Sequence, residues 1–553
     1  MHMRAAAALL PSAAICAGAL RSAAGPAREG SGLSAGPSAW SAANASAVKQ
    51  GLWLSPSSLT LELPPGLGAP EAPEGAAEAG LGGRLPPPKG VANYRQLMTN
   101  FADAQYVAYL DVGGQTMGAV LDTGSFEMVV FSSSCYSCGQ AAKYSGRDST
   151  TYVPGKRETE QSYGSGTAFS HDAWDSVRLG PFGSDNQTFW EVVDADMPVL
   201  ATANFHAVVG LGPPETPAVD AWSSAESAAH TIFAMVEHIA QGIQEKSEID
   251  WAMGKFDLAF QSNRRGTVLH NFGVAAFSIC IGARPGADGY FVWNDTSHRD
   301  FPERFVRLPV VGAQTWTVDV SAVRLTPRLR HSRDGHIDVG CSAEQPCSAM
   351  IDSGTALLVV PSFAVSALAE QASKLNDDCS NIQDLPGLSF TMHGSTFTLP
   401  PDAYIGQVTG EVPAYMRLSP QLQLSPQLRR LGPHLQSRRL RSPNGTCELV
   451  VMESTAQSST GPLFILGHPF FRAYYATFDL GSTARERAVH VAPATEQCTP
   501  AKAVPGDTAL ARLSAQGRRQ VVPETPFWRR LEPSKMLMPH AVLKATTSQF
   551  VKV

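Results

Sequence analysis

Two short segments of the sequence place an aspartate where it can do chemistry. Residues 119–125 read Ala-Val-Leu-Asp-Thr-Gly-Ser, and residues 349–355 read Ala-Met-Ile-Asp-Ser-Gly-Thr. In each segment three apolar residues lead into an aspartate, a tight glycine turn and a hydroxyl residue. One such turn is common and usually structural. Two copies, with Asp122 and Asp352 230 residues apart, predict a duplicated lobe in which each copy contributes one carboxylate to a shared site.

A pair of carboxylates at such a site has a specific chemistry. Two carboxylates about 3 Å apart cannot both ionise, so they share a proton and one pKa rises. The ionised partner can deprotonate a bridging water while the protonated partner donates a hydrogen bond to the carbonyl under attack. Ser125 and Thr355 are expected to donate hydrogen bonds that orient the two carboxylates. The pair is expected to titrate as a unit.

The elements that must position these aspartates are mostly β-strands. From about Asn93 the chain shows short β-type runs broken by Gly and Pro, for example at 106–112, 117–121 and 128–131. The strand pattern fades past Asp479. One helical stripe, expected to pack on a core, comprises Ile232, Met235, Val236, Ile239 and Ile243.

The beginning of the chain differs in composition from its middle. One positive charge and a run of about 16 uncharged residues predict a removable signal peptide over 1–22, with a transit peptide or an unprocessed arm as alternatives. Between residues 21 and 90, 45 of 70 positions are Ala, Gly, Pro or Ser. Such a segment cannot bury enough apolar surface to fold compactly, so 23–92 is expected to be a propeptide or linker.

Charge is distributed unevenly along the chain. The 43 Lys and Arg against 49 Asp and Glu give a net charge of −6, which offers no general reason to expect a nucleic-acid partner. Residues 499–553 carry nine basic and three acidic residues, and 498–553 is interpreted as a basic tail. The run 419–442 repeats Ser-Pro-Gln-Leu and contains five arginines, which is typical of a solvated loop. A processing site or a site for an anionic partner is the alternative for this loop.

The cysteines favour an oxidising compartment. Cys16 lies in the predicted signal peptide and eight others follow it. Cys135-x-x-Cys138 alone could be a redox or zinc half-site, but no second pair follows at metal-ligand spacing, so no metal is predicted. No stretch after the signal region reaches 18 uncharged apolar residues, and no transmembrane segment is expected. Four N-x-S/T sequons agree with a secretory route: Asn44, Asn186, Asn294 and Asn444.

A third segment, between the two aspartates, has the form of a hairpin tip. Residues 162–166 read Ser-Tyr-Gly-Ser-Gly, with Tyr163 41 residues after Asp122. Taken with the twin Asp-x-Gly turns, this order resembles the pepsin-like aspartic proteases. The resemblance implies that the hairpin is the flap that closes over substrate, with Tyr163 as the flap tyrosine and Gly164 and Ser165 beside the substrate.

Two further segments extend the resemblance to about residues 93–497. Residues 205–212 and 464–479 resemble the segments that support the first and the second active-site loop in that family. The implied fold is all-β, with two pseudo-twofold-related lobes (93–275 and 276–497), a central cleft and few helices. The residues implied to support the dyad are Thr123, Gly124, Ser125, Ser353, Gly354 and Thr355.

The implied activity is that of an aspartic endopeptidase. It would act as a monomer on polypeptides at acidic to mildly acidic pH, without cofactor or metal, secreted or in an acidic vesicle or vacuole. The family often places disulfides where this chain has Cys135–Cys138, Cys341–Cys347 and Cys379–Cys447. Cys280 and Cys498 are then left as a buried free thiol and a terminal thiol, unless the C-terminal strand brings them together.

Some positions depart from the family pattern. Val129 stands where the family commonly has a tryptophan that is hydrogen-bonded to the flap tyrosine, so the flap is expected to be held differently. His206 and His468 replace acidic residues and are predicted to be surface residues of the support loops. The stretch before Asn93 lacks the basic, helical pattern of family propeptides.

Two rival functions fit the sequence less well than proteolysis. A catalytically silent binding protein on the same scaffold usually loses a catalytic aspartate or the glycine behind it, and both are intact here. A carboxylate-pair glycosidase needs carboxyls about 5 to 9.5 Å apart, which twin Asp-x-Gly loops do not suggest.

Overall fold

The computed structural model describes residues 93–213, 266–312, 315–327, 335–376, 378–409, 446–502 and 529–536. Five predictions lie wholly or mostly outside these residues: the signal peptide, the low-complexity segment, the helix over 232–243, the basic loop 419–442 and most of the basic tail. No helix within the described ranges has the length and apolar character to cross a membrane.

The first half of the described chain is built from long β-strands. The strands are β1 (Tyr94–Phe101), β2 (Gln105–Val112), β3 (Gln115–Asp122), β4 (Met128–Phe131), β5 (Val153–Tyr163), β6 (Gly166–Leu179), β7 (Phe182–Asp196) and β8 (Ala207–Gly210). Short helical turns connect them: η1 (Tyr136–Ala141), η2 (Gly146–Asp148), η3 (Pro198–Thr202) and α6 (Val268–Asn271).

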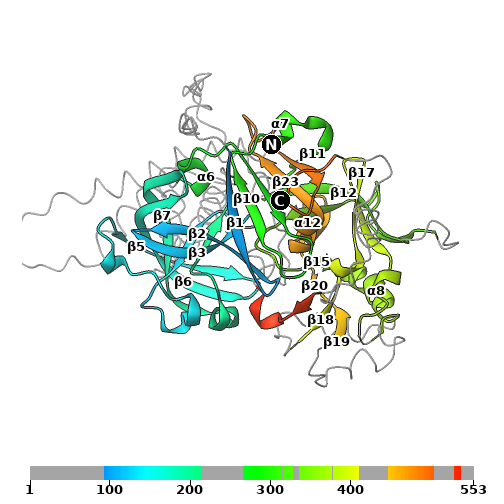
Figure 1. Ribbon diagram of the computed structural model, residues 1–553, viewed down its shortest axis with the longest axis horizontal. Coiled ribbons are helices and arrows are strands. Elements are labelled where there is room, and N and C mark those ends of the chain that lie inside the picture. Colours follow the sequence, from blue (N-terminus) through cyan, green and yellow to red (C-terminus); the bar gives the residue numbers. More distant parts are fainter. Residues whose placement is uncertain are drawn as a thin grey trace, which may run out of the picture. The chain divides into compact units, whose positions relative to one another are not determined.

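The second half is also mainly β. Its strands are β9 (Ala276–Ile281), β10 (Gly289–Trp293), β11 (Val306–Pro309), β12 (Thr317–Thr326), β13 (Ile337–Gly340), β14 (Cys347–Ile351), β15 (Leu358–Pro361), β16 (Gly387–Met392), β17 (Ser395–Leu399), β18 (Ile405–Val408), β19 (Thr446–Leu449), β20 (Val451–Ser454), β21 (Gln457–Ser458), β22 (Gly461–Leu466), β23 (Tyr474–Asp479), β24 (Ala488–Pro493) and β25 (Arg530–Leu531). Its helices are α7 (Ser297–Asp300), η4 (Pro302–Arg304), α8 (Ser362–Ala372), η5 (Ile382–Asp384), η6 (Pro401–Ala403), α12 (His468–Ala473) and η8 (Pro533–Lys535). Figure 1 shows long strands with few short helices among them, which confirms the predicted all-β class.

Two groups of four strands repeat one pairing pattern. In the first, β3 is parallel to β8, β8 is antiparallel to β4, and β4 is parallel to β7. In the second, β14 is parallel to β22, β22 is antiparallel to β15, and β15 is parallel to β20. β3 ends at Asp122 and β14 ends one residue before Asp352. The repeat is the duplicated unit that the twin aspartate segments predict.

The strands that deliver the aspartates are buried along most of their length. All five residues of β14 are buried, as are the last six of β3. Strands covered on both faces read as continuous apolar runs rather than as alternating patterns, which explains the three apolar residues before each aspartate. The ends of these strands therefore lie in the interior, where a carboxylate must be hydrogen-bonded to be tolerated.

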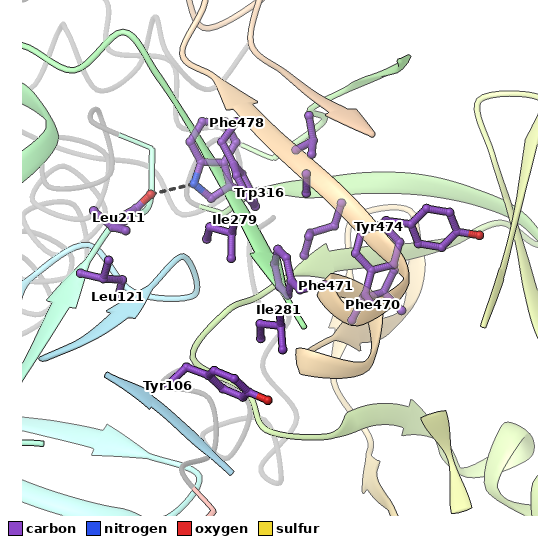
Figure 2. Packing of buried hydrophobic residues seen from close by; sticks show 14 of the residues in the cluster. Tyr106, Leu121, Leu211, Ile279, Ile281, Trp316, Phe470, Phe471, Tyr474 and Phe478 are labelled. Atoms are coloured by element: carbon purple, nitrogen blue, oxygen red, sulfur yellow. Dashed lines mark hydrogen bonds between the residues drawn. The ribbon is translucent and has the colours of Figure 1, made fainter. Parts of the chain in front are cut away.

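An aromatic cluster fills the core beside these strands. Phe277 stacks on Phe291 and Phe478 with ring centroids 5.2 and 4.9 Å apart. Trp316 packs on Phe478 at 5.1 Å, and its indole N–H donates to the carbonyl of Leu211 at 2.8 Å, the dashed contact in Figure 2. Stacked and edge-on pairs of this kind add to the stabilisation from buried area.

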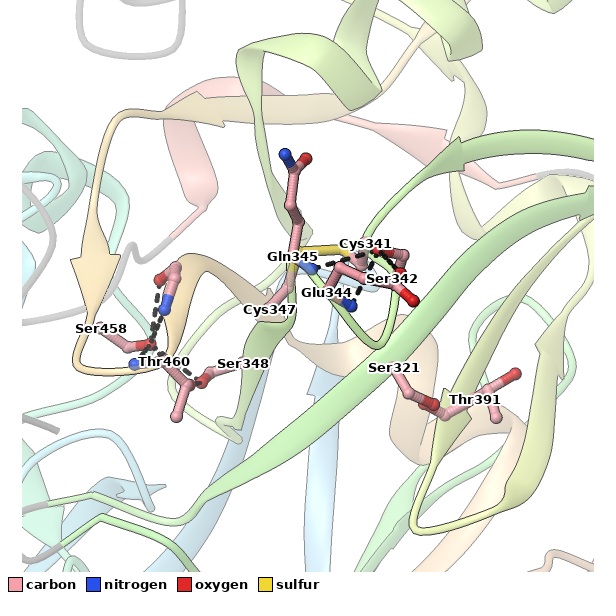
Figure 3. The surroundings of a disulfide bond; sticks show 11 residues. Ser321, Cys341, Ser342, Glu344, Gln345, Cys347, Ser348, Thr391, Ser458 and Thr460 are labelled. Carbon is pink, nitrogen blue, oxygen red and sulfur yellow. Dashed lines mark hydrogen bonds between the residues drawn. A yellow bond between two sulfur atoms is a disulfide. The ribbon is translucent and has the colours of Figure 1, made fainter.

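Four disulfides connect the described cysteines. Three of them, Cys135–Cys138, Cys341–Cys347 and Cys379–Cys447, are the pairs that the resemblance implies. Figure 3 shows Cys341–Cys347 closing the turn that leads into β14, beside Ser348.

The favoured interpretation of the two remaining cysteines was wrong. Cys280 and Cys498 are joined, with their Cα atoms 5.5 Å apart, rather than being free thiols. β9 carries Cys280 and pairs with β23, which pairs with β24, so the residues after β24 return beside β9. The two cysteines are 218 residues apart in the sequence, so no local pattern predicts that they are neighbours.

Regular structure continues further along the chain than the strand pattern indicated. β24 pairs with both β23 and β11, and β25 adds to β18 as a parallel strand. β25 is only two residues long, too short for any periodicity to be recognised. Residues 529–536 are thus built into the folded protein although they lie in the stretch interpreted as a basic tail.

Candidate active site

The loops that follow β3 and β14 are joined by reciprocal hydrogen bonds. The backbone N–H of Thr123 donates to Oγ of Ser353 at 3.0 Å, and the N–H of Ser353 donates to Oγ1 of Thr123 at 2.9 Å. Each hydroxyl then donates across to the opposite strand, Thr123 to the carbonyl of Ile351 and Ser353 to that of Leu121. The two loops are therefore fixed to each other within the buried interior.

Each aspartate is oriented by its own loop. Asp122 accepts from the N–H of Gly124 at 2.9 Å and from the hydroxyl of Ser125 at 2.6 Å. The second loop repeats the arrangement, since Asp352 accepts from the N–H of its own glycine at 2.8 Å and from the hydroxyl of Thr355 at 2.5 Å. Ser125 and Thr355 thus lie where the sequence predicts them to lie. These bonds hold each carboxylate plane in one orientation.

The two carboxylates meet at the point where the loops touch. A Cβ on Gly124 would lie 2.7 Å from the Asp352 carboxylate, and one on Gly354 would lie 2.2 Å from Oδ1 of Asp122. Glycine is required at both positions because any side chain would collide with the opposite acid. Asp122 and Asp352 are 2% and 0% exposed.

Burial and the neighbouring carboxylate both act on the pKa of Asp352. Burial raises the pKa of Asp352 well above its usual value, and the charge of Asp122 raises it further. The two side chains are also hydrogen-bonded to each other, which favours the protonated form of Asp352. This is the electrostatic condition for a shared proton.

Two segments that are distant in sequence from the aspartate loops support them through backbone hydrogen bonds. The N–H of Leu211 donates to the carbonyl of Asp122 at 2.7 Å, and the N–H of Gly212 donates to that of Ser125 at 2.7 Å. In the second loop the N–H of Asp352 donates to the carbonyl of Leu466 at 3.1 Å. The segments 205–212 and 464–479 therefore support the two aspartate loops, as predicted.

Comparison with known proteins decides the family. The family model described as eukaryotic aspartyl protease matches residues 105–421. The chain belongs to this family. It is similar to pepsin A of Bos taurus, with 23% identity over 398 residues that cover 70% of this chain and 84% of that protein. It is also similar to gastricsin of Cavia porcellus (24% over 397 residues; 69% and 79%) and to the vacuolar aspartic protease of Candida albicans (26% over 408 residues; 72% and 78%). These similarities support aspartic endopeptidase activity.

The residues expected to form the flap lie at the tip of a β-hairpin. β5 and β6 pair up to Tyr163 and Gly166, which leaves Gly164 and Ser165 at the tip. Gly166 has φ +135°, and a Cβ there would lie 2.0 Å from the carbonyl of Asp196. The Oγ of Ser165 is buried and has no hydrogen-bond partner among the residues described.

Tyr163, the last residue of β5, is buried in one hydrophobic cluster with Val129 and Trp190. Only 4% of its surface is exposed. Burial raises the pKa of the Tyr163 phenol, and the charges of Asp122 and Glu127 raise it further. The tyrosine is therefore protonated at any working pH and is close enough to Asp122 to be influenced by its charge.

The prediction that His468 is a surface residue was wrong. It is 3% exposed, because α12 packs it against Tyr106 at a ring distance of 4.9 Å. Its Nε2–H donates to the carbonyl of Ser353 at 3.1 Å, and its backbone N–H donates to that of Thr355. Burial, aided by Arg472, lowers the pKa of His468 to about 3, so a neutral imidazole supports the second loop.

His206 is also more than a surface residue. It is half-buried, and its Nδ1 accepts from the N–H of Gly118 at 3.1 Å while its own N–H donates to the Gly118 carbonyl at 2.7 Å. Burial lowers the pKa of His206, which keeps the accepting nitrogen unprotonated. The histidine thus ties the first support segment to β3.

Trp316 is a site-supporting residue that sequence reasoning missed. Its indole N–H donates to the carbonyl of Leu211, and its own carbonyl accepts from the N–H of Ile351 at 3.1 Å. One fully buried residue therefore contacts the supports of both aspartate loops. Trp316 belongs to no recognisable motif. The one signal in the sequence is its position directly before an alternating run of apolar and polar residues.

One cluster with metal-ligand residue types forms away from the dyad. His298, Asp479 and His490 bring potential ligand atoms within 4.8 Å of one another. Arg299 already faces this cluster, with Nη2 3.3 Å from Oδ2 of Asp479 and Nε 3.2 Å from Nε2 of His298. Because a divalent cation would be repelled by that guanidinium, we assign no metal to the cluster.

Proposed function

We propose that Asp122 and Asp352 are the catalytic pair of this aspartic endopeptidase. The observation that carries the proposal is the mutual approach of the two loops, in which the glycine of each leaves room only for the aspartate of the other. The two carboxylates share one proton, and the raised pKa of Asp352 supports its role as the protonated partner.

The reaction follows from the placement of that proton. The ionised carboxylate takes a proton from a water held between the two acids, and the water oxygen attacks the peptide carbonyl carbon. The protonated carboxyl donates to the carbonyl oxygen as it becomes a hydroxyl, which gives a tetrahedral diol. A proton then passes to the amide nitrogen, the C–N bond breaks, and an acid and an amine leave. Positioned proton transfer of this kind contributes roughly 10²–10⁴-fold in rate.

The surrounding residues have separate roles in this proposal. Thr123 and Ser353 hold the two loops together, Ser125 and Thr355 orient the acids, and the glycines of both loops allow close contact. Tyr163 closes the flap over the bound peptide. Gly164 leaves the flap tip free of a side chain. The Ser165 hydroxyl, which is buried and has no hydrogen-bond partner among the described residues, would bond to the substrate backbone when the flap moves to admit a peptide. An extended peptide bound this way would present alternate side chains to pockets.

We further propose activity at acidic to mildly acidic pH in the secretory pathway or a vacuole. The raised pKa of Asp352 lets the pair keep its shared proton above the usual titration range of a carboxyl. The relatives include pepsins and vacuolar proteases, which supports such a location in general terms. In this proposal 1–22 is removed as a signal peptide, 23–92 is a propeptide or linker, and 93–275 and 276–497 form the two lobes of a monomer.

The experiment is cleavage of a quenched fluorescent peptide library from pH 3 to 7, with and without a statine-type transition-state mimic. The expected result is acid-dependent cleavage that the mimic blocks and that Asp122→Asn abolishes. A folded protein that binds the mimic but cleaves no peptide would refute the enzymatic role and favour a binding protein on this scaffold.

A further inference from the structure

The position where the family commonly has a flap-binding tryptophan holds Val129, yet a tryptophan lies beside it. β4 and β7 run parallel with Val129 in register with Trp190. Residues in register on neighbouring strands project to the same face. Val129, Trp190 and Tyr163 are all buried and belong to one hydrophobic cluster. An indole therefore lies next to Val129, on the neighbouring strand.

A carboxylate fixes the orientation of this indole. Nε1–H of Trp190 donates to Oε1 of Glu127 at 2.7 Å, a charge-assisted bond that is stronger than one between neutral groups. The carbonyl of Glu127 accepts from the N–H of Gly210 at 2.9 Å, so its backbone is anchored to the first support segment. The influence of the Glu127 charge on Tyr163 agrees with a position close to the flap tyrosine.

The second lobe provides an internal comparison. β4 and β15 each begin six residues after their aspartate, so Glu127 corresponds to Leu357 and Val129 to Val359. Val359 is in register with Met452, which therefore corresponds to Trp190.

The corresponding pair in the second lobe is entirely apolar. Leu357 and Met452 are buried together in one hydrophobic cluster. The same strand arrangement thus forms without a carboxylate or an indole. The polar pair occurs in the lobe that carries the flap, so strand pairing alone does not explain it.

The strands of the expected flap lie in the same sheet as the strand that carries the indole. β6 pairs with β5 on one side and with β7 on the other. A side chain on β7 can therefore act on the hairpin through direct packing rather than through a distant relay.

We propose that Glu127 and Trp190 are positioning residues that hold the flap tyrosine Tyr163 in place of the missing tryptophan. This inference rests on the proposed role of the 163–166 hairpin as the flap. Trp190 provides the indole surface against which Tyr163 packs, and Glu127 fixes the ring plane of Trp190. Val129 is small because the volume beside it is filled from β7.

The first test converts the pair to its counterparts in the second lobe. Trp190→Met and Glu127→Leu are expected to lower kcat/KM about tenfold to a hundredfold, mainly through kcat, and to weaken the statine-type mimic by a similar factor. Glu127→Gln, which keeps an acceptor oxygen, is expected to recover part of the loss. Met452→Leu at the matching register position of the other lobe is the control and is expected to change kcat less than twofold.

The second test exchanges the two side chains. Trp190→Val alone is expected to lose activity, and Val129→Trp with Trp190→Val is expected to return kcat/KM to within about fivefold of the parent, because an indole again lies beside Tyr163. Trp190→Phe serves if the exchange does not fold, with a loss of mimic affinity as the expected result. Folded Trp190 and Glu127 variants with parental kcat and mimic affinity would overturn the inference. The parent must cleave peptide in a manner dependent on Asp122 in the same assay, so failure of the catalytic proposal would be seen separately.

Discussion

At the residue scale, the site buries two groups that affect the pH dependence of stability in opposite directions. The pKa of Asp352 is raised, and the pKa of His468 is lowered. Asp352 has a raised pKa, so the folded state holds a proton that the unfolded state releases, and stability falls as pH rises through that window. His468 has a pKa lowered to about 3. Between pH 3 and 6.5 the unfolded state binds a proton there that the folded state does not, so stability falls as pH falls.

His468→Asn is therefore expected to reduce the acid sensitivity of the fold. At pH 4 protonation of His468 in the unfolded chain alone costs the folded state about 3 kcal/mol, and asparagine, which can still donate to the Ser353 carbonyl, removes that cost. The measurement is the free energy of unfolding of parent and variant from pH 3 to 8. We expect the difference between them to shift in favour of the variant as pH falls from 7 to 4. A difference that does not change with pH would contradict the buried neutral imidazole.

His468 also shows what the sequence could not provide at this scale. The residue types around each aspartate were enough to predict which groups orient the carboxylates, because those bonds form within four consecutive residues. The burial of His468 depends on Tyr106, which is more than 300 residues away along the chain. Contacts at that separation leave no local pattern.

At the element scale, the aspartate loops depend on strands from both copies of the repeat. Trp316 lies just before β12, contacts the first support segment through its indole and binds β14 through its carbonyl. The carbonyl of Leu211 that accepts from it is next to the residues that hold Asp122. A buried carbonyl left without its donor costs about 1–3 kcal/mol.

Trp316→Phe is expected to lower the free energy of unfolding by about 1–3 kcal/mol and to lower kcat as well. The matched control is Trp293→Phe, since Trp293 is equally buried and its indole donates to Gln96 at 3.0 Å, away from the aspartate loops. We expect the control to lose stability with kcat retained, measured by denaturant unfolding and peptide cleavage. Equal effects on kcat in both variants would show that Trp316 has no specific connection to the site.

The repeat itself was predictable, whereas its strand order was not. Twin Asp-x-Gly turns after apolar runs indicate two similar units. The parallel pairing of β4 with β7 joins residues about 60 positions apart, and this pairing brings Trp190 beside Val129. Apolar periodicity identifies strands but does not identify their partners, so the position of Trp190 beside Val129 was not predicted.

At the scale of the whole molecule, residues 529–536 connect parts of the protein that are far apart in sequence. Arg529 is 3% exposed and forms ion pairs with Asp103 at 3.8 Å and Asp402 at 3.0 Å. Gln105 donates to the carbonyl of Lys535 at 2.8 Å. Leu531 and Met536 join a hydrophobic cluster that also contains Ala104 and Leu357. The segment therefore contacts both halves of the described chain.

Truncation after residue 502 is expected to lower the free energy of unfolding by about 3–5 kcal/mol, because Asp103 and Asp402 would lose a buried cationic partner. Truncation after residue 536 keeps the segment and is the control. Arg529→Met tests the ion pairs alone and is expected to lose much of the same stability. Thermal and denaturant unfolding of all three would measure this, and an unchanged stability after truncation at 502 would contradict it.

The central claim is that one carboxylate from each copy of the repeat acts in a single catalytic unit. The most direct measurement is kcat for peptide cleavage by Asp122→Asn, Asp352→Asn and the double variant, with folding checked by unfolding curves. Each single variant is predicted to lower kcat by about 10³-fold or more. The double variant is predicted to lower kcat little further, because neither carboxyl catalyses the reaction without the other. Losses that multiply in the double variant, or a single variant that retains parental kcat, would contradict the claim.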